Sequence, residues 1–410
     1  MVESEPKVAS VWTNRNFMTY MLGKLVANTG HMMASLAVMW LLMEITGSTS
    51  TASFSFIVVY IPTLFISPFA GVILDRVLKR RAMQLIDSLR CCLALIMGVA
   101  MMQALPPIWL VMLYYFLRSL GDTFYHPASQ VMIPNLVERD QLVQANGIEQ
   151  SAQTGGSLLG PMVGALVIAR FGYPAVFFAD AIGFIISVIT LGIIKVQETR
   201  KPLSEGPGLN VAGFVAELKE GLLYIKTKAV IMQLMLFFSI INFCAAGLGV
   251  VMPFYVSERL ANGGIDAMAK LSTASAAGGL VVTLGISTLK RMPHRGKVAV
   301  LSMLIYQASQ MLFGFQTSLV PAMVLSATRS IAMAGGMASS AIYQNEVEPY
   351  IRGRVFSFRS MLSTALNPLG VAVAGIAGEY MPAWMVISVF GAIGTVTSIL
   401  AMFSKRLWNA

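Results

Sequence analysis

Long apolar stretches alternate with short polar connections along nearly the whole chain. Each stretch has about 20 residues or more, the length that a helix needs to cross the hydrocarbon core of a bilayer. Open sheets leave backbone groups unpaired in lipid, so the stretches are predicted to be helices. The pattern predicts twelve membrane spans, at roughly 17–42, 51–74, 83–104, 108–132, 145–169, 174–194, 229–256, 268–289, 298–317, 320–344, 356–378 and 383–403.

Composition supports a membrane protein. The chain has 410 residues, of which 56% are hydrophobic and 12% are charged, whereas soluble domains average about 25% charged residues. Its three cysteines lie within apolar stretches and offer neither a disulfide framework nor a metal-ligand spacing. The first stretch carries Lys24 and His31 and is too long for a cleaved signal peptide.

The distribution of basic residues predicts the orientation. If both termini are cytoplasmic, most of the 29 lysines and arginines fall in cytoplasmic segments. Such a bias is typical of multi-pass proteins of the inner or plasma membrane. It also accounts for the net charge of +10, so no nucleic-acid partner is expected, and membrane lipids are.

A polar segment in the middle of the chain predicts two bundles, at 1–194 and 229–410, joined by a cytoplasmic linker at 195–228. A shift of 211 residues places Arg118 on Arg329, and Lys79-Arg80 on Lys290-Arg291. Parallel repeats of this kind are a known plan of secondary transporters. Two pseudo-equivalent halves favour a working monomer.

Two motifs carry a resemblance to a known family. The run GVILDRVLKRRAM at 71–83 resembles the signature loop between helices 2 and 3 of major facilitator superfamily transporters, and GGSLLGPMVGA at 155–165 resembles their helix-5 antiporter motif. The runs MEITGS, RSLGDTFYHPA and IRGRVFS are most similar to macrolide-efflux and enterobactin-exporter members, which are drug:proton antiporters. The residues that match are Gly71, Asp75, Arg76, Lys79, Arg80 and Arg81 in the loop, and Gly156, Gly160, Pro161 and Gly164 in the helix.

The resemblance implies that the signature loop is a gate. Asp75 would latch the cytoplasmic mouth by pairing with a neighbouring helix, or would only pair locally with Arg76 or Lys79. The glycine usual in this loop is replaced by Leu78, which puts its tight turn in question.

The glycines at 156, 160 and 164 recur every four residues and therefore share one helix face, where a second helix can approach closely. Pro161 permits a bend. Two interpretations remain open: a sliding seam between the two bundles, or ordinary tight helix packing.

Ionisable side chains within the spans are candidates for function, because each costs about 2.5–3.5 kcal/mol near the bilayer centre. Asp122 is expected to carry the proton, with Arg118 one turn away as its modulator and His31 as the second choice; a permanent Asp122–Arg118 pair is the alternative. Asp87 with Arg90 is interpreted as a structural pair. Asp180 is alone in its span and is interpreted as a satisfied polar packing residue or a weak candidate. The substrate cavity is expected to be lined by Lys24, Asn28, His126, Glu149 and Arg329.

These features predict an all-α transporter that exports amphipathic small molecules, such as macrolides, dyes or siderophores, by alternating access. The proton gradient is the expected energy source, with no cofactor or metal, since no complete phosphate-binding loop occurs. A lysophospholipid flippase of the same fold is the alternative function. A membrane enzyme is disfavoured, because the three histidines are scattered and no HExxH motif occurs.

Overall fold

A computed structural model describes residues 11–75, 77–138, 141–196, 219–220, 222–260, 263–287, 294–332, 334–348 and 351–408. Within these ranges all regular structure is helical. The elements are η1 (Val11–Thr13), α1 (Arg15–Thr46), α2 (Thr49–Ile57), α3 (Tyr60–Asp75), α4 (Lys79–Gln103), α5 (Ile108–Met132), η2 (Ile133–Asn135), α6 (Leu142–Ile193), α8 (Ala229–Arg259), α9 (Ile265–Ser287), α10 (Arg295–Gly314), α11 (Leu319–Ile331), α12 (Ala334–Glu346), α13 (Arg352–Tyr380), α14 (Ala383–Met402) and α15 (Lys405–Trp408).

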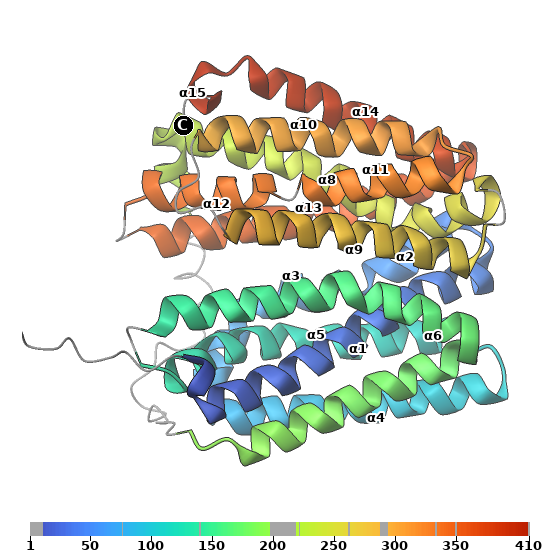
Figure 1. Cartoon of the computed structure of the whole chain (residues 1–410), viewed down its shortest axis with the longest axis vertical. Coiled ribbons are helices and arrows are strands. Elements are labelled where there is room, and N and C mark those ends of the chain that lie inside the picture. Colours follow the sequence, from blue (N-terminus) through green and yellow to red (C-terminus); the bar gives the residue numbers. More distant parts are fainter. Residues whose placement is uncertain are drawn as a thin grey trace, which may run out of the picture.

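The helices form two layers (Figure 1). Helices α1 to α6 make up one layer, here called the first half, and α8 to α15 make up the second half. The start of α1 and the C-terminal α15 lie at the same end of the molecule, at the left of Figure 1, called the termini side. Most of the predicted linker at 195–228 lies outside the described residues, so the division into 1–194, 195–228 and 229–410 stays a prediction.

Two predicted spans differ from the helices in their continuity. The span at 51–74 is divided into α2 and α3, and that at 320–344 into α11 and α12. The spans at 145–169 and 174–194 share the label α6 but are separated, as predicted, by a break at Gly172, where φ is 77° and ψ is 178°. Glycine adopts this backbone conformation without a steric cost. By length and composition, six helices of the described part can cross a membrane.

The glycine stripe of α6 packs within the first half. A Cβ at Gly160 would lie 3.0 Å from the Thr29 carbonyl oxygen of α1, and one at Gly164 would lie 2.9 Å from Met33 Cα. The prediction of one shared face that admits a second helix is therefore confirmed. The predicted seam between the halves is wrong for these glycines, because their partner is α1.

This packing predicts opposite effects for two neighbouring substitutions. Gly164→Ala should destabilise the protein by about 1–3 kcal/mol, because the added methyl group meets the α1 backbone. Gly155→Ala should be neutral or stabilise by up to about 1 kcal/mol through helix propensity, since nothing lies within 4 Å of its Cβ position. Thermal unfolding of both purified variants tests this. Equal melting temperatures would contradict the packing.

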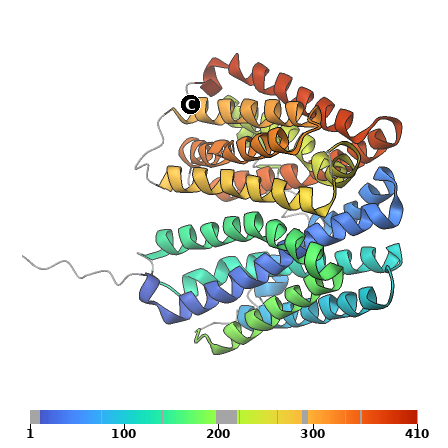
Figure 2. The same ribbon diagram turned by 45° about the vertical axis from the view of Figure 1, so that its right-hand side comes forward.

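Besides packing α6 against α9, the two halves meet at the side opposite the termini. There α2 reaches the second half (Figure 2) and packs on α13. The Glu379 carboxylate of α13 accepts hydrogen bonds from the Ser48 hydroxyl at 2.5 Å and the Ser50 backbone N–H at 3.1 Å. Because these donors belong to the first turn of α2, the carboxylate also faces the positive end of the helix dipole. Thr49 Oγ1 donates to the Gly375 carbonyl at 3.1 Å.

Candidate functional site

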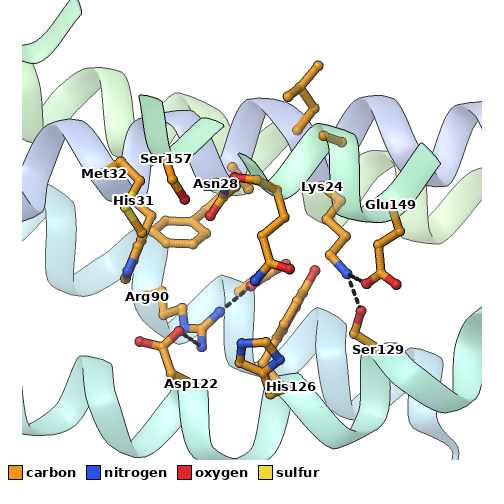
Figure 3. A pocket seen from close by; sticks show the side chains of 17 residues that line it. Lys24, Asn28, His31, Met32, Arg90, Asp122, His126, Ser129, Glu149 and Ser157 are labelled. Atoms are coloured by element: carbon orange, nitrogen blue, oxygen red, sulfur yellow. Dashed lines mark hydrogen bonds and ion pairs between the residues drawn. The ribbon is translucent and has the colours of Figure 1, made fainter. Parts of the chain in front are cut away.

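A pocket of about 290 Å³ lies inside the first half, between α1, α4, α5 and α6 (Figure 3). Its wall combines polar and charged side chains from all four helices, far apart in the sequence. The pocket brings together most of the side chains that the sequence singled out. Those that line it are Lys24, Asn28, His31, Asp122, His126 and Glu149.

Lys24 of α1 and Glu149 of α6 form an ion pair across the pocket (Figure 3). The Lys24 ammonium group also donates to Ser129 Oγ of α5 at 2.5 Å. The side chains of the pair are 17% and 19% exposed. These contacts connect α1, α5 and α6 at one end of the pocket. The ion pair is electrically neutral as a whole.

Arg90 of α4 lies between two carboxylates. Its Nη2 donates to Asp122 Oδ1 at 2.6 Å and its Nη1 donates to Asp87 Oδ1 at 3.2 Å. Asp87 is 1% exposed and also accepts from Ser187 Oγ at 2.6 Å, whereas the Asp122 side chain is 38% exposed. The predicted partner of Asp122 is therefore wrong: its ion pair is with Arg90. The arginine connects Asp122 to the Asp87 pair, which was interpreted as separate and structural.

Arg118 of α5 pairs instead with Asp180 of α6. Arg118 Nη1 lies 2.7 Å from Asp180 Oδ2, and both side chains are buried. Asp180, which is alone among the residues of its own span, thus has its partner on another helix. Arg118 also donates to Tyr114 Oη and, from Nε at 2.9 Å, to His31 Nδ1. Because arginine only donates, His31 Nδ1 is the unprotonated nitrogen in this arrangement.

The charges around the pocket nearly balance. Arg118 with Asp180, and Lys24 with Glu149, are neutral pairs. The remaining group holds two carboxylates, those of Asp87 and Asp122, and one arginine. With neutral histidines, the described residues of this cluster therefore carry one net negative charge, which a single proton would neutralise.

A second cavity, of about 370 Å³, lies between the halves. Met32 and Ser157 line both cavities, so the two adjoin. Its wall is mostly apolar, with Leu158 and Pro161 from α6 on one side. Arg329 of α11 lies in this wall and not in the first-half pocket.

The signature loop is only partly within the described residues. Gly71 and Asp75 belong to α3, but the surroundings of their side chains, like the whole of Arg76, fall outside the description. Leu78 has an extended backbone, with φ −70° and ψ 117°, so the turn does not depend on glycine here.

The basic residues that follow begin α4. Arg80 Nη1 donates at 2.8 Å to the carbonyl of Ile194, which caps the C-terminal end of α6. Lys79 is buried and Arg81 is exposed. The loop thus holds the start of α4 against the end of α6, while the latch by Asp75 stays a prediction.

Sequence reasoning gave Arg90 only a structural role and offered Asp180 only as a satisfied polar packing residue or a weak candidate. One signal was available for Asp180: a carboxylate in an apolar span needs a partner, because an unpaired charge there is costly. In the described ranges no group of three or more His, Cys, Asp or Glu side chains is arranged to hold a metal ion.

The architecture and charged pocket can be compared with known proteins. The Major Facilitator Superfamily profile matches residues 20–365. The chain belongs to this superfamily. It is therefore a transporter, not an enzyme, and a multi-pass protein of the plasma membrane.

Two curated relatives of this superfamily member are named for efflux. It is 23% identical over 364 residues to macrolide efflux protein A of Streptococcus pyogenes, with 88% of each chain aligned. It is 25% identical over 371 residues to the multidrug efflux pump Tap of Mycolicibacterium fortuitum, with 86% of each chain aligned.

Solved structures show the same fold at lower identity. The nucleoside transporter NupG matches with a TM-score of 0.70 and 13% identity, over 95% of this chain and 99% of that one. A bacterial homologue of the iron transporter ferroportin, in an inward-facing state, matches with a TM-score of 0.70 and 15% identity, again over 95% and 99%. The all-helical major facilitator fold is thereby confirmed.

Proposed function

We propose that this transporter exports amphipathic small molecules in exchange for protons, by alternating access, with both termini in the cytoplasm. The observation that carries the proposal is the pair of adjoining cavities. One holds the charged cluster, whose single net negative charge a proton would neutralise. The other is a mostly apolar space between the halves. The relatives named for macrolide and multidrug efflux support the direction of transport.

Asp122 is the proposed proton-carrying residue. Its side chain is 38% exposed, so water in the pocket reaches it, whereas Asp87 is 1% exposed. When Asp122 takes a proton, Arg90 keeps an ionised partner in Asp87, so the arginine of this cluster is not left unpaired. Arg90 thus takes the modulating role that the sequence assigned to Arg118. His31 is the weaker candidate, since its Nδ1 accepts from Arg118.

One proton per cycle supplies enough energy. A charge that crosses about 100 mV gains ~2.3 kcal/mol, and one pH unit adds ~1.4 kcal/mol. Each ~1.4 kcal/mol is a tenfold concentration ratio. Exchange of one proton for one neutral molecule therefore sustains a gradient of a few hundredfold.

In the proposed cycle, the contacts of Glu379 with α2 close the extracellular side. Since Glu379 belongs to the second half and α2 to the first, these contacts must break when that side opens. The carboxylate therefore stabilises the state seen here, which is closed at the side opposite the termini.

Removing this carboxylate should shift the conformational equilibrium. Glu379→Gln is expected to shift the equilibrium toward the extracellularly open state, because the neutral amide interacts less favourably than the carboxylate with the positive N-terminal end of α2. Spin labels at the exposed positions Phe54 and Tyr380, with the native cysteines replaced, report the separation of α2 from α13. Glu258→Gln removes an exposed charge of α8 and is the control. Identical distance distributions for both variants would contradict the latch.

Export is tested in cells that produce the protein, by measuring accumulation of macrolides, dyes and catecholate siderophores. Some of these compounds should accumulate less than in cells without the protein, and an uncoupler should abolish the difference. Unchanged accumulation of the whole panel, together with transbilayer movement of labelled lysophospholipid, would overturn export in favour of a flippase.

A further inference from the structure

The wall of the cavity between the halves carries a net positive charge. Arg329 is the single charged side chain among the described residues that line it. The rest of the wall is apolar or carries hydroxyl groups, including those of Ser275 and Ser326. Four flexible thioether side chains contribute to the apolar part, and they can adapt to ligands of different shapes. They belong to Met32, Met39, Met252 and Met268.

Among the described residues, Arg329 lacks the counter-ion that its repeat equivalent has. Arg118, at the same position of the first half, is neutralised by Asp180. The shift of 211 residues places Asp180 on Gly391 of α14, a helix without any carboxylate. The helices packed on α11 also offer none nearby: α10 has no acidic residue, and α9 has only Asp266 in its first turn.

The contacts that Arg329 makes with described residues do not satisfy all of its N–H groups. Its Nη2 lies 3.4 Å from Tyr306 Oη, and its guanidinium lies 5.3 Å from the Tyr306 ring centroid and 5.8 Å from that of Phe313. Its buried Nε has no acceptor in the part of the chain that the structure describes. An arginine stays charged in proteins, and a buried charge is costly unless it is paired.

An unpaired arginine in a substrate-sized cavity selects its ligand by charge. Its fork of N–H donors matches planar and tetrahedral oxyanions in two-point contacts. A cationic ligand would meet like charge, while the carboxylates of the neighbouring pocket are engaged: Asp122 with Arg90 and Glu149 with Lys24.

We propose that the cavity binds amphiphiles that carry an anionic group, such as a carboxylate, sulfonate or phosphate, with that group on Arg329 and the apolar body against the methionine-lined wall. Anionic amphiphiles are therefore better substrates than cationic ones of the same shape. The proposal rests on the proposed export function, in that this cavity is taken as the substrate site.

Naphthalene-2-sulfonate and 2-naphthyltrimethylammonium test it, because they share the same apolar body and carry an oxyanion and a cationic group, respectively. Binding to the purified full-length protein in neutral detergent is measured by thermal stabilisation over a concentration series. The wild type should bind the sulfonate at least about tenfold more tightly, as expected for one charge-assisted hydrogen bond. Arg329→Gln should lose this preference, and Arg329→Lys should keep part of it. Arg170→Gln, which removes an exposed arginine, should behave as the wild type.

Equal binding of the two ions by the wild type, or an unchanged preference in Arg329→Gln, would overturn the charge selectivity. A melting temperature of Arg329→Gln close to that of the wild type shows that the variant is folded. The accumulation assay separates this failure from that of the export proposal. If compounds are exported but Arg329→Gln exports anionic and cationic ones in wild-type ratio, only the selectivity fails; if nothing is exported, the export function fails.

Discussion

Replacing Asp180 with alanine is expected to destabilise the protein by about 3–5 kcal/mol, because the substitution leaves Arg118 buried without its counter-ion. Both side chains of the pair are almost completely buried, at 4% and 0% exposure. No other residue in the described part offers Arg118 a carboxylate at bonding distance, since Asp122 is engaged by Arg90. The remaining contacts of Arg118 are with neutral groups.

Thermal unfolding of the purified protein measures this effect. Combining Asp180→Ala with Arg118→Met should recover much of the loss, because replacing a buried ion pair with apolar side chains is often neutral. Asp266→Asn, which changes an exposed carboxylate in the first turn of α9, serves as the control. If Asp180→Ala melted like this control, Arg118 would have to be neutralised in another way.

Asp122→Asn is expected to abolish uphill transport while leaving the protein folded. Asparagine keeps the size of the side chain but cannot take up or release the coupling proton. The concentration ratio that vesicles sustain should therefore fall from as much as a few hundredfold to one. Exchange of labelled for unlabelled substrate at equal concentrations should persist, because this reaction needs no net proton movement.

Measuring both uphill uptake and exchange distinguishes a role of Asp122 in proton coupling from a structural role. A merely structural role for Asp122 would impair both reactions together through misfolding. Asp266→Asn again removes a carboxylate far from the pocket and should leave both unchanged. Retention of a substrate gradient by Asp122→Asn would assign the proton to another group.

The helices themselves were predictable from the length of the apolar stretches. In lipid the backbone N–H and C=O groups must pair with one another, and a helix pairs them within one stretch. The break of α6 at Gly172 was predictable too, because it falls in the gap between the predicted spans at 145–169 and 174–194. The divisions of 51–74 into α2 and α3 and of 320–344 into α11 and α12 were not predicted. The stripe at 156, 160 and 164 was correctly placed on one face. Its partner depended on tertiary packing, which spacing along one helix does not encode.

The candidate site was predictable as a set of side chains but not as a set of pairs. Lys24, His31, Asp122 and Glu149 do line one pocket. Asp122 was predicted as the partner of Arg118 because the two lie one turn apart on α5. In the structure each of them pairs with a residue of another helix. Arg90 reaches Asp122 from α4, and Asp180 reaches Arg118 from α6.

The most direct test of proton exchange at Asp122 uses everted membrane vesicles with a respiration-generated pH gradient, to which the exported compounds are added one at a time. With the wild-type protein, and equally with Asp266→Asn, each transported compound should dissipate part of the gradient as protons leave the vesicle in exchange. With Asp122→Asn the gradient should stay intact. Equal dissipation by Asp122→Asn and the wild type would contradict the account.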